Sequence, residues 1–339
     1  MSFSDTWYDV YAQALFGRSI RSALIYDLVY KALGAAMLVP LMAFVLSRLI
    51  LSSGSLSIAN EAIVEFALSI PGLLFALLAL TFTLTSIYAE QAGLMHIASG
   101  ASGGRSTRWM DALATVLSAL PRLLLLALWQ AGILLAWLLP LAAIAAFTYL
   151  TLLNDHDISW YLTNRPPELR YALLIGGLLG CIAAGVICRY LVEWALTIPV
   201  CLYEGETGRS ALRRAQELIR GHRLRALALL VINLMLALVI SAAVLWLSDQ
   251  LVEKLLGAIQ GIRALIFASA LSLALLLALT ALMSFLVLTV YAVLIVHLYL
   301  KILGVDGLPA ERWERAAKAA RMPRWTIIVL LAVLLEEPC

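Results

Sequence analysis

The chain has 339 residues, of which 63% are hydrophobic and 13% are charged, with a mean hydropathy of +0.96 and a net charge of +3. Soluble globular domains are about 45–50% apolar, so this composition excludes them and indicates an integral membrane protein. The small net charge gives no support for a nucleic-acid partner.

The N-terminal segment lacks the features of a cleaved secretory signal. Residues 1–16 include Asp5 and Asp9, contain no Lys or Arg, and have no apolar core of the required length. We therefore expect the first hydrophobic span to be retained as an anchor.

Six apolar stretches are long enough to cross a bilayer, which requires about 20 residues. They run without two-residue alternation, and only helices or closed barrels satisfy the backbone in lipid, so helices are predicted. The predicted spans are Tyr30–Leu51, Pro71–Ile97, Leu123–Leu153, Leu169–Leu202, Ala226–Leu247 and Ala264–Leu300. The expected fold class is an all-α polytopic membrane protein with amphipathic interfacial helices on its cytoplasmic side.

A seventh apolar stretch begins at Thr326 and stops at Glu336, about half the length that a span needs. The sequence thus predicts six transmembrane helices plus a truncated seventh. We divide the chain into a multi-span membrane domain, residues 1–325, and a truncated seventh segment, residues 326–339.

The basic residues separate sharply between alternate loops. Of the 24 Lys and Arg residues, 19 fall on the side that includes the N-terminus and 5 on the other. The positive-inside rule places the N-terminus in the cytoplasm. The expected location is the bacterial cytoplasmic (inner) membrane, with multiple passes.

Short arginine-rich helices are predicted at the cytoplasmic interface. A Gly-Arg-Ser triplet opens at Gly17, Gly104 and Gly208, and its serine is a good N-cap for a following helix. The predicted interfacial segments are 19–30, 106–120, 210–220 and, without the triplet, 309–321. Cations on such helices face anionic lipid, and the candidate headgroup-binding residues are Arg18, Arg105, Arg209, Arg213, Arg214 and Arg220.

Five ionisable residues lie near the cytoplasmic ends of the spans. Asp27 and Lys31 are spaced i,i+4, as are Arg189 and Glu193, so each pair can form along one helix face. Glu90 has no local partner and is expected to face another helix or water. The five form a candidate intramembrane polar network. Two interpretations of this network remain open. It lines a functional cavity that binds a lipid headgroup or relays protons, or it consists of structural ion pairs at the edge of the bundle.

Two further features favour structural roles. Asp155, His156 and Asp157 are adjacent in an outer loop and cannot all converge on one metal, so a solvated turn is expected. Glycines at 176, 177, 180 and 185 form a small-residue face that predicts close helix packing. Motifs for phosphate loops, serine hydrolases and zinc peptidases are missing, and we predict no catalytic residue, no metal and no cofactor.

Three stretches resemble a known family. They are SLSIANEAIVEFALSIPG from Ser55, IYAEQAGL from Ile87 and DISWYLTNRPPE from Asp157, and the elbow GRSALRRAQELIRG from Gly208 is also similar. Together they resemble the membrane domain of bacterial membrane-bound glycerophosphodiester phosphodiesterases. The resemblance implies a TIM-barrel domain on the outer side, following the membrane part, that hydrolyses glycerophosphodiesters.

The catalytic residues of that family do not transfer to this sequence. Its His-Arg-Gly motif is not matched, because His222-Arg223 is followed by Leu224 and lies in a predicted cytoplasmic elbow. The first hypothesis is therefore a non-catalytic module that anchors a separate or downstream phosphodiesterase domain and presents lipid-derived substrate, with membrane lipids as further partners and no nucleic acid. The alternative is a transporter or permease for lipids or small molecules.

Overall fold

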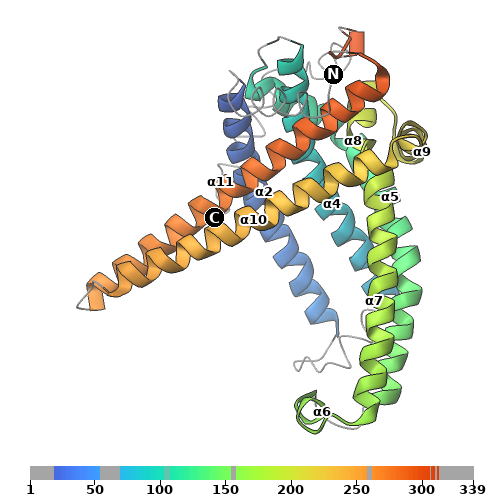
Figure 1. Ribbon diagram of the computed structural model, residues 1–339, viewed down its shortest axis with the longest axis vertical. Helices are drawn as coiled ribbons and strands as arrows, with labels where there is room; N and C mark the ends of the chain where they lie inside the picture. The colour runs from blue at the N-terminus through green and yellow to red at the C-terminus, as the bar shows by residue number, and fades with distance from the viewer. Residues whose placement is uncertain are drawn as a thin grey trace.

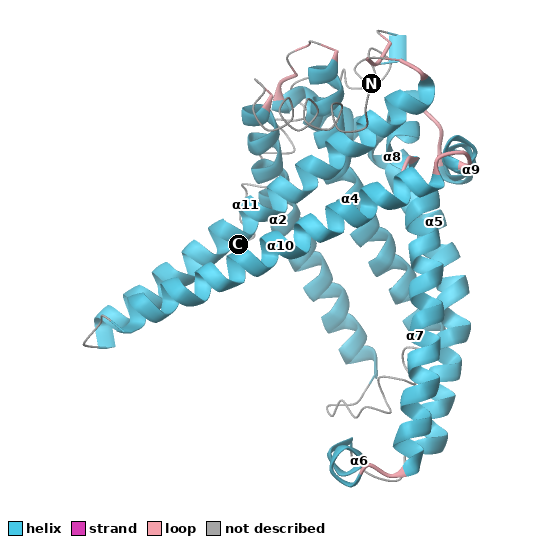
Figure 2. Ribbon diagram, in the orientation of Figure 1, coloured by secondary structure: helices cyan, strands magenta, loops and turns pink. Residues whose placement is uncertain are grey.

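A computed structural model of the chain describes residues 19–53, 69–103, 105, 107–153, 158–257, 262–305, 307–309 and 311–312. Within these residues every regular element is helical (Figure 2). The elements are α2 (Ile20–Ser53), α4 (Ile70–Ser102), α5 (Trp109–Leu152), α6 (Ile158–Asn164), α7 (Pro167–Glu193), α8 (Thr197–Pro199), the π-helical turn η1 (Val200–Glu204), α9 (Gly208–Ile219), α10 (Arg223–Gly257) and α11 (Ile262–Leu303).

Five stretches of the described residues are long and apolar enough to cross a membrane, and the protein is a multi-pass membrane protein. They are Ile70–Ser102, Trp109–Leu152, Pro167–Glu204, Arg223–Lys254 and Ala268–Leu303. The first predicted span falls within α2, which is helical but is not one of the five. The predicted seventh segment, residues 326–339, lies outside the described residues, so the total number of spans stays a prediction.

The helices converge at one end of the molecule and diverge toward the other (Figure 1). The hairpin of α10 and α11 extends away from the paired α5 and α7, and α2 and α4 lie between these two arms. The end where they meet also holds α8, η1 and α9. We call it the basic end, after the arginines of α9 and of the start of α10: Arg209, Arg213, Arg214, Arg220, Arg223 and Arg225.

Side-chain packing is concentrated at the basic end. The buried apolar residues come from the start of α2, α4, the first half of α5, the segment 192–203, α9, the start of α10 and the second half of α11. Farther along the arms large apolar side chains are exposed, such as Phe147, Leu174 and Leu277. Lipid tails are as apolar as these side chains, so a membrane protein gains little by burying them against one another.

The fourth predicted span is not a continuous helix. Helix α7 ends at Glu193, residues 194–196 form turns, and the chain continues through α8 and η1. From Val192 to Tyr203 nearly every side chain is buried. Pro199 has no backbone N–H to donate, which is the sequence signal for this break.

Two of the predicted interfacial helices are not separate elements. Segments 19–30 and 106–120 are largely the opening turns of the long helices α2 and α5. Segment 210–220 matches an independent helix, α9, which the turn at Gly221-His222 separates from α10. The fourth segment, 309–321, lies almost wholly outside the described residues. Ser210 is the third residue of α9 and Thr207 is its N-cap, so the predicted serine cap is displaced. A helix that continues into lipid keeps its backbone hydrogen bonds, which favours merging.

The glycine face of α7 does not mediate helix packing. A Cβ added at Gly176, Gly177, Gly180 or Gly185 would meet no atom within 4 Å. Helix α7 contacts α5, but no described residue lies close to these four glycines, so the expectation of close packing there is wrong. Helix α7 begins with Pro166 as its N-cap and Pro167 in its first turn.

Candidate functional site: three polar clusters at the basic end

The first cluster joins α2 to α4. Lys31 Nζ lies 2.6 Å from Asp27 Oδ2 and 3.5 Å from Glu90 Oε1. The i,i+4 pair forms as predicted, and Glu90 faces another helix. The Asp27 side chain is 1% exposed, so its charge depends on Lys31 for compensation.

Two tyrosines of α2 fix the same interface. The Tyr26 hydroxyl donates to the Ala89 carbonyl at 2.8 Å, and the Tyr30 hydroxyl donates to the Ser86 carbonyl at 2.7 Å. Both acceptors are backbone carbonyls of α4. These bonds hold the two helices at a defined rotation, so the carboxylates and Lys31 are prearranged.

The second cluster surrounds Glu193, which is 5% exposed. Its Oε1 accepts from Arg189 Nε at 3.2 Å and from Arg223 Nη2 at 3.2 Å, and its Oε2 accepts from Gln216 Nε2 at 3.2 Å. The donors come from α7, α10 and α9. The predicted Arg189–Glu193 pair forms within α7, and Gln216 of α9 and Arg223 of α10 join it. No ion pair of the described residues connects this cluster to Asp27, Lys31 or Glu90.

The third cluster surrounds Glu204 at the end of η1. Arg214 Nε of α9 donates to Glu204 Oε2 at 2.9 Å, and the Tyr299 hydroxyl of α11 donates to Oε1 at 3.0 Å. Arg312 Nη1 lies 3.8 Å from Oε1 and donates to the Tyr299 oxygen at 3.3 Å. The hydrogen bond to Glu204 raises the pKa of Arg214, which keeps its charge fixed. Sequence reasoning missed this cluster.

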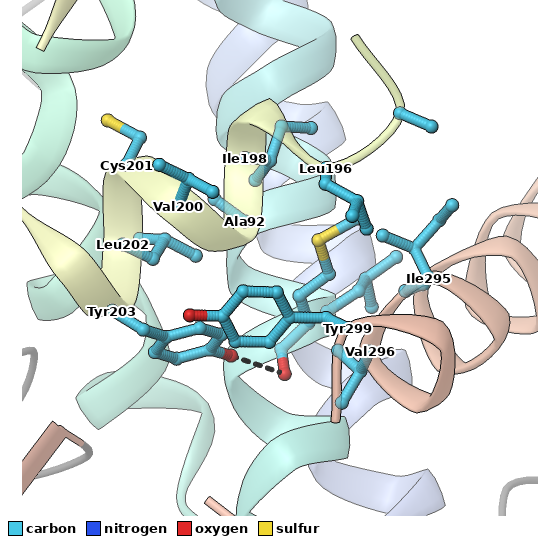
Figure 3. Close-up of a cluster of buried hydrophobic side chains, with 14 of the residues drawn as sticks. Ala92, Leu196, Ile198, Val200, Cys201, Leu202, Tyr203, Ile295, Val296 and Tyr299 are labelled. Carbon is cyan, nitrogen blue, oxygen red and sulfur yellow. Dashed lines mark hydrogen bonds between the residues drawn. The ribbon is translucent and has the colours of Figure 1, made fainter. Parts of the chain in front are cut away.

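Beside Glu204, an apolar core locks η1 in place (Figure 3). Labelled side chains from α4, α8, η1 and α11 gather there, and the ring centroids of Tyr203 and Tyr299 lie 5.9 Å apart. The Tyr203 hydroxyl hydrogen-bonds Ser99 Oγ at 2.9 Å and the Met95 carbonyl at 3.1 Å. The broken span is therefore held by buried side chains, and the buried Tyr203 hydroxyl is hydrogen-bonded to α4.

The candidate headgroup-binding arginines occupy different environments. Arg209 of α9 and Arg220, its C-cap residue, are exposed, and the exposed Arg213 lies 3.5 Å from Glu217. Arg214 is held by Glu204, and Arg105 is half-buried between α4 and α5. Arg18 lies outside the described residues, as do Asp155, His156 and Asp157.

The apolar face of α9 explains its position. Ala211, Leu212, Ala215 and Ile219 are buried against the basic end, and the arginines occupy the opposite side. Such a division is typical of a helix lying along an interface. In the described part of the chain, no group of three or more His, Cys, Asp or Glu residues is arranged to hold a metal ion.

Comparison with known families decides the relationship. A family model for the membrane domain of glycerophosphoryl diester phosphodiesterase matches residues 12–335. The chain belongs to this family. The resemblance seen in its sequence is thereby confirmed over nearly its whole length. No curated protein and no solved structure matches the chain.

Proposed function

We propose that this chain is a non-catalytic membrane module that anchors a glycerophosphodiester phosphodiesterase domain and presents lipid-derived substrate to it. The observation that supports this role is the family membership, which covers residues 12–335. The catalytic partner is either a following part of the same polypeptide or a separate protein. Membrane lipids are the second class of partner, and the process served is lipid metabolism.

The proposed orientation places the basic end in the cytoplasm of a bacterial cell, in the inner membrane. The loop charges motivate it, with 19 of 24 basic residues on one side. The fold supports it further, because α9 and the start of α10 gather arginines at the end where the long helices meet. A positively charged surface is attracted to the anionic lipids of the cytoplasmic leaflet.

The test compares hydrolysis by three purified proteins: the chain alone, a fusion of the chain to a catalytic domain, and that domain by itself. The chain alone, given glycerophosphodiesters and divalent metal, is expected to release no glycerol 3-phosphate. A catalytic domain of the phosphodiesterase family fused after residue 339 is expected to hydrolyse vesicle-borne substrate faster than the same domain free in solution. Turnover by the chain alone overturns the non-catalytic role, and equal rates with and without the module overturn presentation.

A transporter or permease is the second candidate. The break at residues 194–196 favours it, because discontinuous helices form the binding sites of many transporters. In this reading Asp27, Lys31 and Glu90 would form part of the translocation route. Reconstituted liposomes provide the test: substrate flux that Glu90→Gln abolishes supports the permease, and absence of flux in the unmodified chain eliminates it.

A further inference from the structure

The cluster around Glu193 carries a net positive charge. Arg189 Nε and Arg223 Nη2 each lie 3.2 Å from the same carboxylate oxygen, so these two nitrogens are no farther apart than twice that distance. One carboxylate and two guanidinium groups leave a net charge of +1. Gln216 adds a donor to the other oxygen but no charge.

The arginines keep most of their hydrogen-bonding capacity. Each guanidinium has five N–H donors, and the bonds to Glu193 use one from each side chain. The Arg189 and Arg223 side chains are 71% and 53% exposed, whereas that of Glu193 is 6% exposed. The carboxylate therefore supports the pair from the protein interior, and the free donors are available at the surface.

Glu193 also explains how two like charges stay close. Without a shared anion, two guanidinium groups at this separation repel each other, and their flexible side chains would move apart. A buried carboxylate that accepts from both, and is itself held by Gln216, reduces that repulsion. The result is a prearranged pair of planar donors, which is the geometry that recognises a phosphate group.

Exposed apolar residues lie next to Arg189 and Arg223 in the sequence. Leu191 is 56% exposed and Leu224 is 82% exposed, and each is within two residues of one of the arginines. Arg189 lies in the last turns of the apolar helix α7, and Arg223 begins the apolar helix α10. Phosphate-binding donors at the edge of apolar, lipid-facing helices match an amphiphile with an anionic head, since its acyl chains can lie along the helices.

We propose that Arg189 and Arg223 bind the phosphate of an anionic phospholipid headgroup, with Glu193 as the positioning residue for both. This site deepens the proposed presenting function, on which it rests, by locating one bound lipid at the junction of α7, α9 and α10. It is distinct from the outward arginines of α9, which face the bilayer surface as a diffuse charge.

The experiment measures lipid retention by the full chain in detergent with native mass spectrometry. Phosphatidylglycerol is titrated against the unmodified protein, Arg189→Gln and Arg223→Gln, with phosphatidylcholine as the zwitterionic comparison. Arg225→Gln is the matched control, because it removes the same charge from an exposed residue two positions along α10. The melting midpoint of each variant verifies folding, and Arg189→Lys and Arg223→Lys replace any glutamine variant that fails to fold.

Loss of either arginine is expected to weaken phosphatidylglycerol binding about tenfold, since a charge-assisted hydrogen bond is lost in each case. The control is expected to change it less than about threefold, and phosphatidylcholine binding is expected to be weak throughout. Equal retention by the site variants and the control overturns the site.

Two further measurements complete the experiment. One distinguishes a lipid phosphate from a soluble phosphate compound, and the other distinguishes failure of the lipid site from failure of the presenting function. If inorganic phosphate or glycerol 3-phosphate displaces the lipid at equal concentration, the same arginines bind a soluble phosphate compound, and the lipid assignment is overturned. If retention depends on both arginines but the module does not accelerate vesicle hydrolysis, the lipid site stands and the presenting role fails. If hydrolysis is accelerated without arginine-dependent retention, only the site fails.

Discussion

The ring of Tyr26 occupies the space that a side chain at Gly93 would need. A Cβ built at Gly93 collides with two carbons of that ring and with the Tyr26 hydroxyl oxygen. Tyr26 is fully buried, and its hydroxyl donates to Ala89, one turn before Gly93 on α4. The approach of α2 to α4, and with it the positions of Asp27 and Glu90, depends on this absence of a side chain.

Replacing Gly93 by alanine is therefore expected to destabilise the fold. Overpacking of this kind typically costs about 1–3 kcal/mol, and the shift of α2 adds to it. Thermal unfolding in detergent measures the change. Gly177→Ala is the control, since its Cβ meets no atom within 4 Å and alanine favours a helix. A Gly93→Ala melting midpoint at or above that of Gly177→Ala contradicts the packing.

Replacing Lys31 alone is expected to destabilise the fold more than replacing both Lys31 and Asp27. Lys31→Met leaves the buried Asp27 carboxylate without its 2.6 Å partner, at a cost of about 2–4 kcal/mol in unfolding free energy. The double variant Lys31→Met with Asp27→Asn removes the buried charge and is expected to recover at least half of this loss. Denaturant unfolding of the four proteins measures it, and strictly additive effects would show that the two side chains do not interact.

Glu204 is expected to couple α9 to α11. Glu204→Gln weakens the contacts to Arg214 and Tyr299, and we expect a loss of about 1–2 kcal/mol because the carboxylate is only 14% exposed. A double-mutant cycle with Tyr299→Phe should give a coupling energy of about 0.5 kcal/mol or more. Glu217→Gln is the control: its side chain is 49% exposed, and its loss should cost less than about 0.5 kcal/mol. Similar losses for the two glutamate variants would contradict the coupling.

The proposed orientation predicts opposite labelling at the two ends of the molecule. In a cysteine-free background, Arg213→Cys on α9 and Thr163→Cys on α6 place exposed thiols at the basic end and at the far end of the α5–α7 arm. With intact cells and a membrane-impermeant maleimide, only the thiol at position 163 is expected to react. After lysis both should react, which confirms that each thiol is accessible. Labelling of position 213 alone in intact cells reverses the orientation.

The sequence by itself determined the features that depend on local geometry. Apolar runs without alternation specify helices in lipid, and the five spans of the described residues follow from them. Residues four apart share a helix face, so the pairs Asp27–Lys31 and Arg189–Glu193 could be predicted from spacing. The family resemblance also rested on local strings of residues, and it holds over residues 12–335.

Only the tertiary structure decided which helices meet and which polar groups they share. Arg223 reaches Glu193 from 30 residues away, and Tyr299 reaches Glu204 from 95. The glycine face of α7 shows the same limit, because its pattern predicted packing and none of the described helices lies against it. The physical reason is that a neighbouring helix and a lipid tail are equally apolar, so hydrophobic pattern marks what enters the membrane but not which faces pair. Those pairings depend on a few long-range contacts, such as Tyr26 against Gly93 and the carboxylates of Glu193 and Glu204, which the sequence pattern does not encode.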